Sequence, residues 1–373
     1  MAHIAIIHNT LDFQGGADVV CLQTIATLQP THDITLFTVS ETSPAKLASK
    51  FNIQIDSRSL QLMRPPAGMT IASILSAASE QLGDLLASRS VLIQWYFRQF
   101  AENFDAVVST ANELDISIPS LQYIHYPQFW HADDGRIELA NTLVSSVGAP
   151  RRQTLSDHKT TVVANSQWTA DVFHDRYGVM PAVVHPPIAQ IECPHPWNAR
   201  QDGVVVIGRL APDKRQHKAI ELIDRLRADG YDLHLHIAGS VSTAYRSYVR
   251  ALSTAAAKRP YVHVERDISR ERLEQLLCEH KYGLNLKQRE HFGMSVAEYV
   301  SAGLHTLVHD SGGQRDIVRH REEYLFETIP QAVNQIEMIH DTDIPPELSS
   351  DHFGISTFRS QIKSFVDSTL SIG

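Results

Sequence analysis

The stretch VVVIGRLAPDK, residues 204–214, runs from an apolar, β-branched segment into a loop that contains Arg209 and Lys214. Such a segment is typical of a buried parallel strand. After this stretch, strand-like runs alternate with helix-length segments as far as LHTLVHD, residues 304–310. This alternation indicates parallel strands joined by crossover helices. We therefore predict a doubly wound α/β domain over residues 203–355.

A second alternating series precedes this domain. Its strand-like runs are HIAIIHN (3–9), DITLFTV (33–39), DAVVSTA (105–111) and TVVANS (161–166). Residues 189–202, AQIECPHPWNARQD, interrupt the pattern with prolines and polar side chains and are typical of an interdomain linker. We predict an N-terminal α/β domain over residues 1–188. The amphipathic pattern of residues 356–373 predicts a final helix that could pack on either domain, with packing back on the N-terminal domain as our choice.

Composition narrows the classes of function. A chain of 373 residues suits two domains, and its net charge of −9 argues against general nucleic-acid binding. No run approaches the roughly 18 apolar residues of a membrane span, and the first residues lack the basic region and cleavage site of a secretory signal. Cys21, Cys193 and Cys278 are far apart and form no CxxC pair, so we expect neither disulfides nor a zinc site, and a cytoplasmic location.

Arg209 and Lys214 are two cations on one loop that directly follows a strand. If the loop folds back, both could reach a single anionic group, and a diphosphate is a natural partner for such paired donors. The alternative is that both are solvated surface cations. The loop alone leaves these two interpretations equally open.

A second group of candidate residues lies in REHFGMSVAEYVSAG, residues 289–303. Gly293, Met294 and Ser295 stand where a helix is predicted to begin, and free N–H groups at a helix start favour phosphate. Glu298, one turn further on, could accept hydrogen bonds from a ribose diol, while Glu290 would face a sugar. Alternatively, both acids are solvated and merely stabilise the helix start.

The N-terminal half offers weaker candidates. Gly15 and Gly16 lie between a strand and a helix, where their backbone could approach a phosphate, although taken alone a plain tight turn is the better interpretation. They do not form a GxGxxG fingerprint. His125 follows the strand-like run LQYI and could contact a substrate at the strand end, but a satisfied core or surface histidine is the simpler alternative.

Together these motifs resemble the retaining nucleotide-sugar glycosyltransferases of the GT-B fold. That family is characterised by an E-x7-E pattern after an upstream Arg and Lys, which matches Glu290, Glu298, Arg209 and Lys214. The resemblance extends to GG at 15–16 and to ANS, GRLAPDK, IAGS and HDSGGQRDIV further on. Within the family, HYP, EHFG and HDSGG are similar to the mannosyltransferases that add α-1,2-linked mannose to lipid-linked oligosaccharides.

The resemblance implies two Rossmann-like domains that face a central cleft, with a nucleotide sugar held by the C-terminal domain. It assigns catalytic roles to His125, Arg209, Lys214 and Glu290. The donor-binding residues that it implies are Gly15, Gly16, Arg209, Lys214, Ile268 of the DIS loop, Glu290, Phe292, Gly293, Met294, Ser295 and Glu298. Arg209 and Lys214 would bind the phosphates, Glu298 the ribose and Glu290 the transferred sugar.

The implied activity is the transfer of a sugar, with retention of its anomeric configuration, from a GDP- or UDP-linked donor to a glycan or lipid-linked acceptor. Mannose from GDP-mannose is the sugar that the resemblance favours. No metal ion or other cofactor is expected, because cations and helix amides replace the divalent ion. A sugar-nucleotide epimerase or hydrolase of the same fold and a non-catalytic sugar-nucleotide-binding protein are the alternatives. Aromatic residues at 95–97 and 129–130 suggest either core packing or peripheral contact with the inner membrane face.

Overall fold

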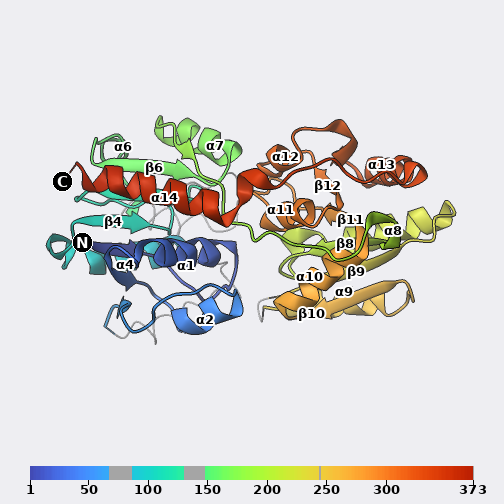
Figure 1. Ribbon diagram of the computed structural model, residues 1–373, viewed down its shortest axis with the longest axis horizontal. Coiled ribbons are helices and arrows are strands. Elements are labelled where there is room, and N and C mark those ends of the chain that lie inside the picture. The colour runs from blue at the N-terminus through green and yellow to red at the C-terminus, as the bar shows by residue number, and fades with distance from the viewer. Residues whose placement is uncertain (67–85, 130–147, 243–244, 373) are drawn as a thin grey trace. The chain divides into compact units, whose positions relative to one another are not determined.

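The computed structural model describes residues 1–66, 86–129, 148–242 and 245–372. These divide into two compact units, the first made of residues 1–187 with 355–373 and the second of residues 188–354. Each unit is an α/β domain built on one parallel sheet, as predicted from the alternating segments (Figure 1).

The first unit has a seven-stranded sheet in the order β3-β2-β1-β4-β5-β6-β7. Its strands are β1 His3–Ile7, β2 Asp33–Phe37, β3 Gln61–Met63, β4 Ala106–Ser109, β5 Ser120–Ile124, β6 Thr160–Ala164 and β7 Ala182–Val183. Its helices are α1 Gly16–Leu28, α2 Pro44–Lys50, α4 Leu86–Phe97, α6 Arg152–Leu155, α7 Gln167–Tyr177 and α14 Ile355–Leu370. The sequence also predicts a helical segment near residues 69–101, which the structure describes only from residue 86 on.

Both faces of this first sheet are buried. In β1, Ile4 and Ile6 pack into a core with α1 and α14, whereas Ala5 and Ile7 belong to a second core with α4. A strand buried on both faces has no need of alternating polar residues, which explains the continuous apolar run at the start of the chain. Figure 1 shows α14, in red, lying along the first unit.

The second unit has a six-stranded sheet in the order β10-β9-β8-β11-β12-β13. Its strands are β8 Gln201–Ile207, β9 His234–Gly239, β10 Val262–Arg266, β11 His280–Asn285, β12 His305–His309 and β13 Leu325–Phe326. Its helices are α8 His217–Ala228, α9 Arg246–Ala256, α10 Arg270–Glu279, α11 Met294–Ser301, α12 Gln314–Ile317 and α13 Ile329–Thr342. The order reverses between β8 and β11, and the carboxyl ends of strands at such a switch point commonly form ligand sites.

The stretch from residue 189 to residue 200, predicted as part of a linker, packs against the second unit. Ile191 is buried there, and the Arg200 guanidinium donates a 2.8 Å hydrogen bond to the Ala302 carbonyl. Cys193, in the same stretch, is disulfide-bonded to Cys278 at the end of α10, with their Cα atoms 5.0 Å apart. Our expectation of no disulfide was wrong, because local cysteine spacing carries no information on a contact between residues 85 positions apart.

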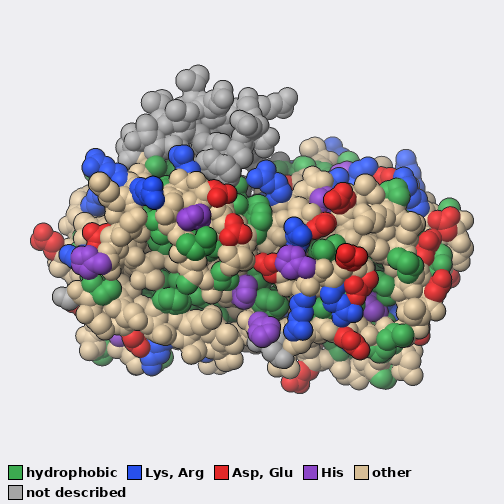
Figure 2. Space-filling view, turned by 90° about the horizontal axis from the view of Figure 1, so that it is seen from above, with side chains coloured by type: hydrophobic (Ala, Val, Ile, Leu, Met, Phe, Trp, Pro, Cys, Tyr) green, Lys and Arg blue, Asp and Glu red, His purple; other side chains and the backbone are tan. Residues whose placement is uncertain are grey.

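Charged side chains are distributed without large regions of one sign on the face shown in Figure 2. Among the described residues drawn there, Lys and Arg lie interspersed with Asp and Glu. Within the described residues, no helix combines the length and the apolar character that crossing a membrane requires.

Candidate functional site

The loop after β8 carries the two predicted phosphate-binding cations. The side chain of Lys214 lies over Gly208, because a Cβ atom placed on that glycine would be 3.8 Å from the lysine Cδ. The backbone of Arg209 is held by the buried Gln216, whose amide donates a 2.8 Å hydrogen bond to the Arg209 carbonyl. The Arg209 guanidinium stacks over the ring of Tyr245 at 5.5 Å. The loop therefore folds back at the strand end, as its predicted role requires.

Gly239, at the end of β9, allows this loop to lie close to the sheet. A Cβ atom on Gly239 would be 1.8 Å from the Gly208 carbonyl oxygen, so no larger residue fits. The two strand ends are also joined by hydrogen bonds from the Gly208 amide to the Ala238 carbonyl and from the Leu210 amide to the Ser240 carbonyl. The IGR and AGS motifs thus form one structural unit.

Glu290 brings the loop after β11 into contact with the loop after β8. Its Oε2 atom lies 2.5 Å from the Lys214 ammonium, and its Oε1 atom lies 3.4 Å from the ammonium of Lys287. Lys287 also lies 3.6 Å from Asp213. The structure therefore places Glu290 and Lys214, predicted from separate motifs, in one cluster. The sequence analysis missed Lys287, although its position three residues before a predicted site acid made it a reasonable candidate.

The charge of Glu290 is stabilised by this cluster. Burial by itself would raise the pKa of the Glu290 carboxyl, but the positive charges of Lys214 and Lys287 lower it by more, so the pKa lies well below 4.5. The Glu290 residue as a whole is only 7% exposed. Glu290 is thus held as an anion, suited to accepting hydrogen bonds or stabilising positive charge and unsuited to donating a proton near neutral pH.

The HDSGGQRDIV segment supports this cluster from the neighbouring strand. The Gly313 amide donates a 2.8 Å hydrogen bond to the Glu290 carbonyl, and Gly312 forms a parallel bridge with Glu290. The side-chain amide of the buried Gln314 bonds to the carbonyls of Lys287 and His309, both at 2.9 Å. In the sequence analysis this segment contributed only to the family resemblance, and its function in positioning the Glu290 loop was missed.

Helix α11 begins where the sequence predicts it. Gly293 is its N-terminal cap, with a φ of 104° that side chains disfavour, and the first N–H groups that follow have no acceptor inside the helix. Phe292 is buried against Phe353, whereas Met294 and Ser295 remain half-buried. The geometry is compatible with an anion at the helix start.

Glu298 is paired with a residue that the sequence analysis did not single out. Its carboxylate contacts the guanidinium of Arg270, which also bonds to Glu274 at 2.7 Å. Arg270 follows the DIS loop, in which Asp267 has a φ of 50° and accepts a 3.0 Å hydrogen bond from the Val241 amide. Ile268, in the same loop, is half-buried. The role of Glu298 at a ribose stays a prediction, and Arg270 would orient its carboxylate.

In the first unit, Gly15 caps α1 and Gly16 begins it. The Asp18 carboxylate accepts a 2.8 Å hydrogen bond from the Gly15 amide and lies 2.9 Å from Nε2 of His8. Asp18 and His8 are both buried, and the other His8 ring nitrogen lies 3.1 Å from the Thr110 carbonyl. Asp18 therefore anchors the glycine turn to the sheet, a function that its sequence position alone did not reveal.

His125 follows β5, as predicted, and two asparagines hold its backbone. Asn112 accepts hydrogen bonds from the amides of His125 and Tyr126, at 2.6 and 3.1 Å, and Asn165 donates one to the His125 carbonyl at 3.1 Å. Asn112 has a φ of 65°, which asparagine tolerates better than most residues. The two asparagines fix the direction in which the His125 side chain leaves the strand end.

The aromatic residues at 95–97 and 129 mostly pack in the core, which is the first of the two interpretations given above. Phe97 and Phe129 are buried, and Tyr96 packs against Phe37 and Phe100. Trp95 is the exception, with 59% of its surface exposed. Trp130, also predicted to contribute, lies outside the described residues.

Comparison with known proteins shows which family part of the chain resembles. Residues 189–341 match the family Glycosyl transferases group 1. The chain is 26% identical to the GDP-Man:Man(3)GlcNAc(2)-PP-Dol alpha-1,2-mannosyltransferase of Candida glabrata over 223 residues, which are 52% of this chain. A protein of the same name from Eremothecium gossypii is 30% identical over 165 residues, 40% of this chain. The alignments span 44% and 28% of those two relatives, so the chain matches less than half of their length.

Solved structures show the fold. The crystal structure of Anabaena Alr3699/HepE in complex with UDP-glucose has a TM-score of 0.69 with this chain, at 16% identity, over 99% of this chain and 100% of that one. WaaG, a glycosyltransferase involved in lipopolysaccharide biosynthesis, has a TM-score of 0.63 at 13% identity, over 99% of both chains. With the two parallel sheets described above, these structures confirm the predicted GT-B fold, and residues 189–341 of this chain match the group 1 glycosyltransferases.

Proposed function

We propose that this protein is a retaining glycosyltransferase that moves mannose from GDP-mannose to a lipid-linked glycan. The observation that carries the proposal is the contact between Lys214 and Glu290, which joins the loops after β8 and β11 at the switch point of the donor-type domain. The names of the sequence relatives support mannose, GDP and a lipid-linked acceptor.

The donor would bind along the carboxyl ends of the strands in the second unit. Arg209 and Lys214 would contact the diphosphate, and the N–H groups of residues 292–295 would add neutral donors at the start of α11. Glu298, oriented by Arg270, would accept hydrogen bonds from the ribose hydroxyls. The diphosphate would compete with Glu290 for the Lys214 ammonium, which would leave the Glu290 carboxylate available to the hydroxyls of the sugar.

In the transfer step, the bond between the anomeric carbon and the diphosphate oxygen breaks. An oxygen of the acceptor forms a new bond to that carbon on the same face of the sugar, and the acceptor proton passes to the departing diphosphate. Lys214 and Arg209 stabilise the negative charge that develops on the leaving group, and the anionic Glu290 stabilises the positive charge on the sugar. No divalent ion is needed in this scheme, because the side-chain cations supply the charge.

The first unit would contribute the acceptor side. His125 would hydrogen-bond the transferred sugar, and the turn at Gly15 and Gly16 would approach the diphosphate through its backbone. The acceptor would be a glycan carried on a lipid, so the enzyme would work at a membrane surface, where the exposed Trp95 is suited to interfacial contact.

A donor screen tests the proposal. We expect GDP-mannose to raise the melting temperature more than UDP-glucose or free mannose does, because a ligand that binds only the folded state stabilises it. Radiolabelled mannose should then move from GDP-mannose to a synthetic lipid-linked oligosaccharide, and anomeric analysis should find an α-linkage. Stabilisation by UDP-sugars alone, or a β-linked product, would refute the assignment.

The same assay separates the two alternatives. An epimerase or hydrolase would convert GDP-mannose to an isomer or to free mannose at the same rate with and without an acceptor. A non-catalytic binding protein would be stabilised by the donor without turnover for any acceptor. The contacts of Lys214 and Lys287 with Glu290 favour the transferase. A protein that only binds the donor would not need two lysines that keep this carboxylate ionised next to the sugar.

A further inference from the structure

Three histidines gather on one face of the sheet in the second unit. In β9, Leu235 and Ile237 point into the hydrophobic core, so His234 and His236 face the opposite side. His280 is the first residue of β11, two strands away from β9, and β8 lies between them. All three imidazoles meet above β8.

The ring nitrogens of this cluster lie close enough to share an ion. One ring nitrogen from each of His234, His236 and His280 lies within 4.8 Å of the nitrogens of the other two. The Nε2 atoms of His234 and His280 are 2.9 Å apart. Zinc bonds of about 2.0–2.1 Å would set two ligand nitrogens of a tetrahedral ion about 3.3 Å apart. Small rotations of the three side chains are enough to reach that spacing.

Gly203 of β8 makes this approach possible. It pairs with His234 in the sheet, and a Cβ atom built on it would lie 2.5 Å from Nε2 of His234 and 2.6 Å from Cδ2 of His280. Any side chain at this position would therefore separate the two rings. The glycine forms the floor of the cluster.

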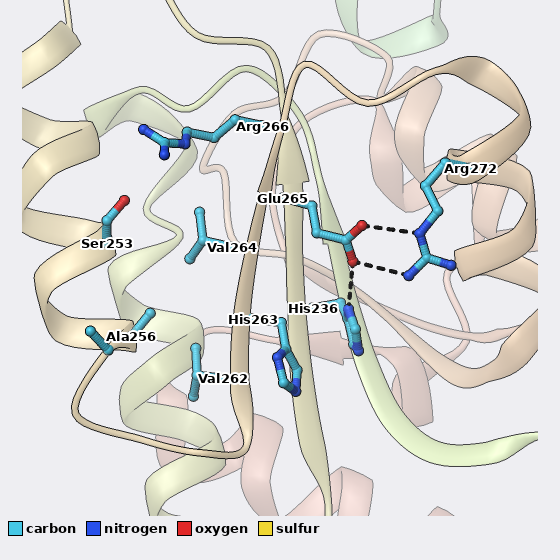
Figure 3. Close-up of a pocket in the computed structure, with 10 residues that line it drawn as sticks. His236, Ser253, Ala256, Val262, His263, Val264, Glu265, Arg266 and Arg272 are labelled. Carbon is cyan, nitrogen blue, oxygen red and sulfur yellow. Dashed lines mark hydrogen bonds and ion pairs between the residues drawn. The ribbon is translucent and has the colours of Figure 1, made fainter.

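The outer hydrogen bonds of two histidines have the pattern found around metal ions. Nδ1 of His280 lies 2.7 Å from the Leu276 carbonyl, which can only accept, so this nitrogen carries the proton and Nε2 presents its lone pair. Nδ1 of His236 lies 2.9 Å from the Glu265 carboxylate. Arg272 in turn donates two hydrogen bonds to Glu265 (Figure 3). Metal-bound histidines usually donate their second N–H to such a carboxylate or carbonyl.

The three imidazoles are also poised in the neutral form that binds metals. Burial lowers the pKa of His234 and of His236, and it lowers that of His280 to about 4. A neutral imidazole needs to lose no proton before it binds an ion.

We propose that His234, His236 and His280 bind one Zn²⁺ ion through their ring nitrogens, with water in the fourth position. Three imidazole ligands suit zinc, copper and nickel, and zinc accepts the tetrahedral arrangement most readily. The ion would join β9 to β11 across β8. This proposal is independent of the glycosyltransferase assignment and concerns a site that no sequence motif indicated.

The site lies away from the proposed donor site. His234 and His280 begin their strands, whereas Arg209 and Glu290 follow the carboxyl ends of β8 and β11. Because the strands are parallel, the two sites lie at opposite ends of the strands. Of the three histidines, His236 lines a hollow of about 570 Å³ together with His263, Glu265 and Arg272 among others (Figure 3). His234 and His236 are only half-buried, so an ion could reach them from solvent. We therefore expect the ion to stabilise the domain without taking part in sugar transfer.

Zinc titration of the full chain without a histidine tag tests the proposal. Calorimetry should give one Zn²⁺ per chain with micromolar or tighter affinity, and Co²⁺ in its place should show the strong visible absorption of a four-coordinate ion. The double variant His234→Ala, His280→Ala should lose this uptake. Failure of the wild-type chain to bind one equivalent, or unchanged binding by the double variant, would overturn the proposal.

Three further variants separate metal binding from folding. His263 is on β10 and pairs with His236 of β9, but it is not a member of the three-histidine group. His263→Ala is therefore a matched control that should still bind zinc. Glu265→Gln should weaken binding about 10- to 100-fold. Gly203→Ala keeps all three ligands and should weaken binding about 10-fold or more, because it displaces their rings. Circular dichroism without zinc should show that each variant is folded. If Glu265→Gln and Gly203→Ala bind zinc as tightly as His263→Ala does, the proposed site is wrong.

Discussion

The Lys214 ammonium lies 2.5 Å from the Glu290 carboxylate, although 76 residues separate the two in sequence. The side chains are 20% and 10% exposed, so the pair is shielded from most of the solvent. This contact connects the cationic loop after β8 with the acidic loop after β11. It also gives each partner a defined orientation before any ligand is present.

Replacement of Lys214 tests the assignment of the leaving-group cation. We expect Lys214→Ala to lower turnover on the order of 10²-fold or more, because it removes a charge that stabilises the transition state. Lys218→Ala is the matched control, since Lys218 is a half-exposed lysine on α8 that pairs with Glu221. Mannosyl transfer measured with labelled donor should separate the two variants, and wild-type turnover in Lys214→Ala would remove Lys214 from the mechanism.

Gly312 tests whether the HDSGG turn positions Glu290. It has a φ of 79°, and a Cβ atom there would lie 2.3 Å from the Glu290 carbonyl oxygen, which is backbone and cannot easily move. Gly312→Ala should therefore lower both the free energy of unfolding, by about 3 kcal/mol, and the transferase activity.

The control for this change is Gly230→Ala. Gly230 also has a positive φ, of 101°, but nothing lies within 4 Å of a Cβ atom built on it. This variant should show the backbone strain alone, about 1 kcal/mol in urea unfolding, with full activity. Equal effects of the two substitutions would show that the contact with Glu290 is unimportant.

The disulfide between Cys193 and Cys278 makes a prediction about thiol content. Denatured, non-reduced protein should expose one reactive thiol, that of Cys21, and reduced protein should expose three. Closing a loop of 85 residues should contribute about 4.5 kcal/mol to the free energy of unfolding in the chain-entropy treatment. Cys193→Ser should lose stability of this order, and reductant should have no further effect on it. Three thiols in the non-reduced protein would contradict the bond.

Glu113 makes stability depend on pH. Burial raises the pKa of its carboxyl to about 7, against the effect of hydrogen bonds from its own amide, Phe129 and Tyr177. The folded state therefore holds a proton that the unfolded state releases near pH 4.5, so the free energy of unfolding should fall as pH rises from about 4.5 to about 7. The full effect is on the order of 3 kcal/mol.

Glu113→Gln isolates this contribution. The amide can accept from Phe129 and Tyr177 as Glu113 does, and it cannot ionise. Urea unfolding between pH 5 and pH 8 should show a smaller decline for the variant than for the wild-type protein. Parallel pH profiles would show that Glu113 does not hold the proton.

Elements with strong local signals were predicted almost to the residue. The sequence also predicts a helix from Gln167 to about Tyr177, and helix α7 occupies Gln167–Tyr177. The Ser166 side chain accepts a hydrogen bond from the Thr169 amide at its start, and Gly178 ends it in the left-handed region. The start of α11 next to Gly293 was also predicted. These signals act within a few residues, so they can be read from the sequence.

Partners of site residues could be predicted only in part. Glu290 and Lys214 came from separate motifs, and the resemblance to a family brought them together before the structure did. Arg270 and Lys287 carried no motif of their own, and their relation to Glu298 and Glu290 depends on how neighbouring strand ends align. His234 and His236 could have been recognised as sharing a strand face, but nothing near residue 280 indicated a third histidine beside them.

The amino-acid sequence by itself determined the two α/β domains, the boundaries of most elements and the motifs of the proposed donor site, because apolar periodicity and capping residues act over short distances. Only the tertiary structure decided which side chains meet. Parallel strands bring their ends together regardless of separation along the chain, so the Cys193–Cys278 bond, the Glu290 cluster and the histidine group all depend on sheet order and on small residues such as Gly203 that allow close approach.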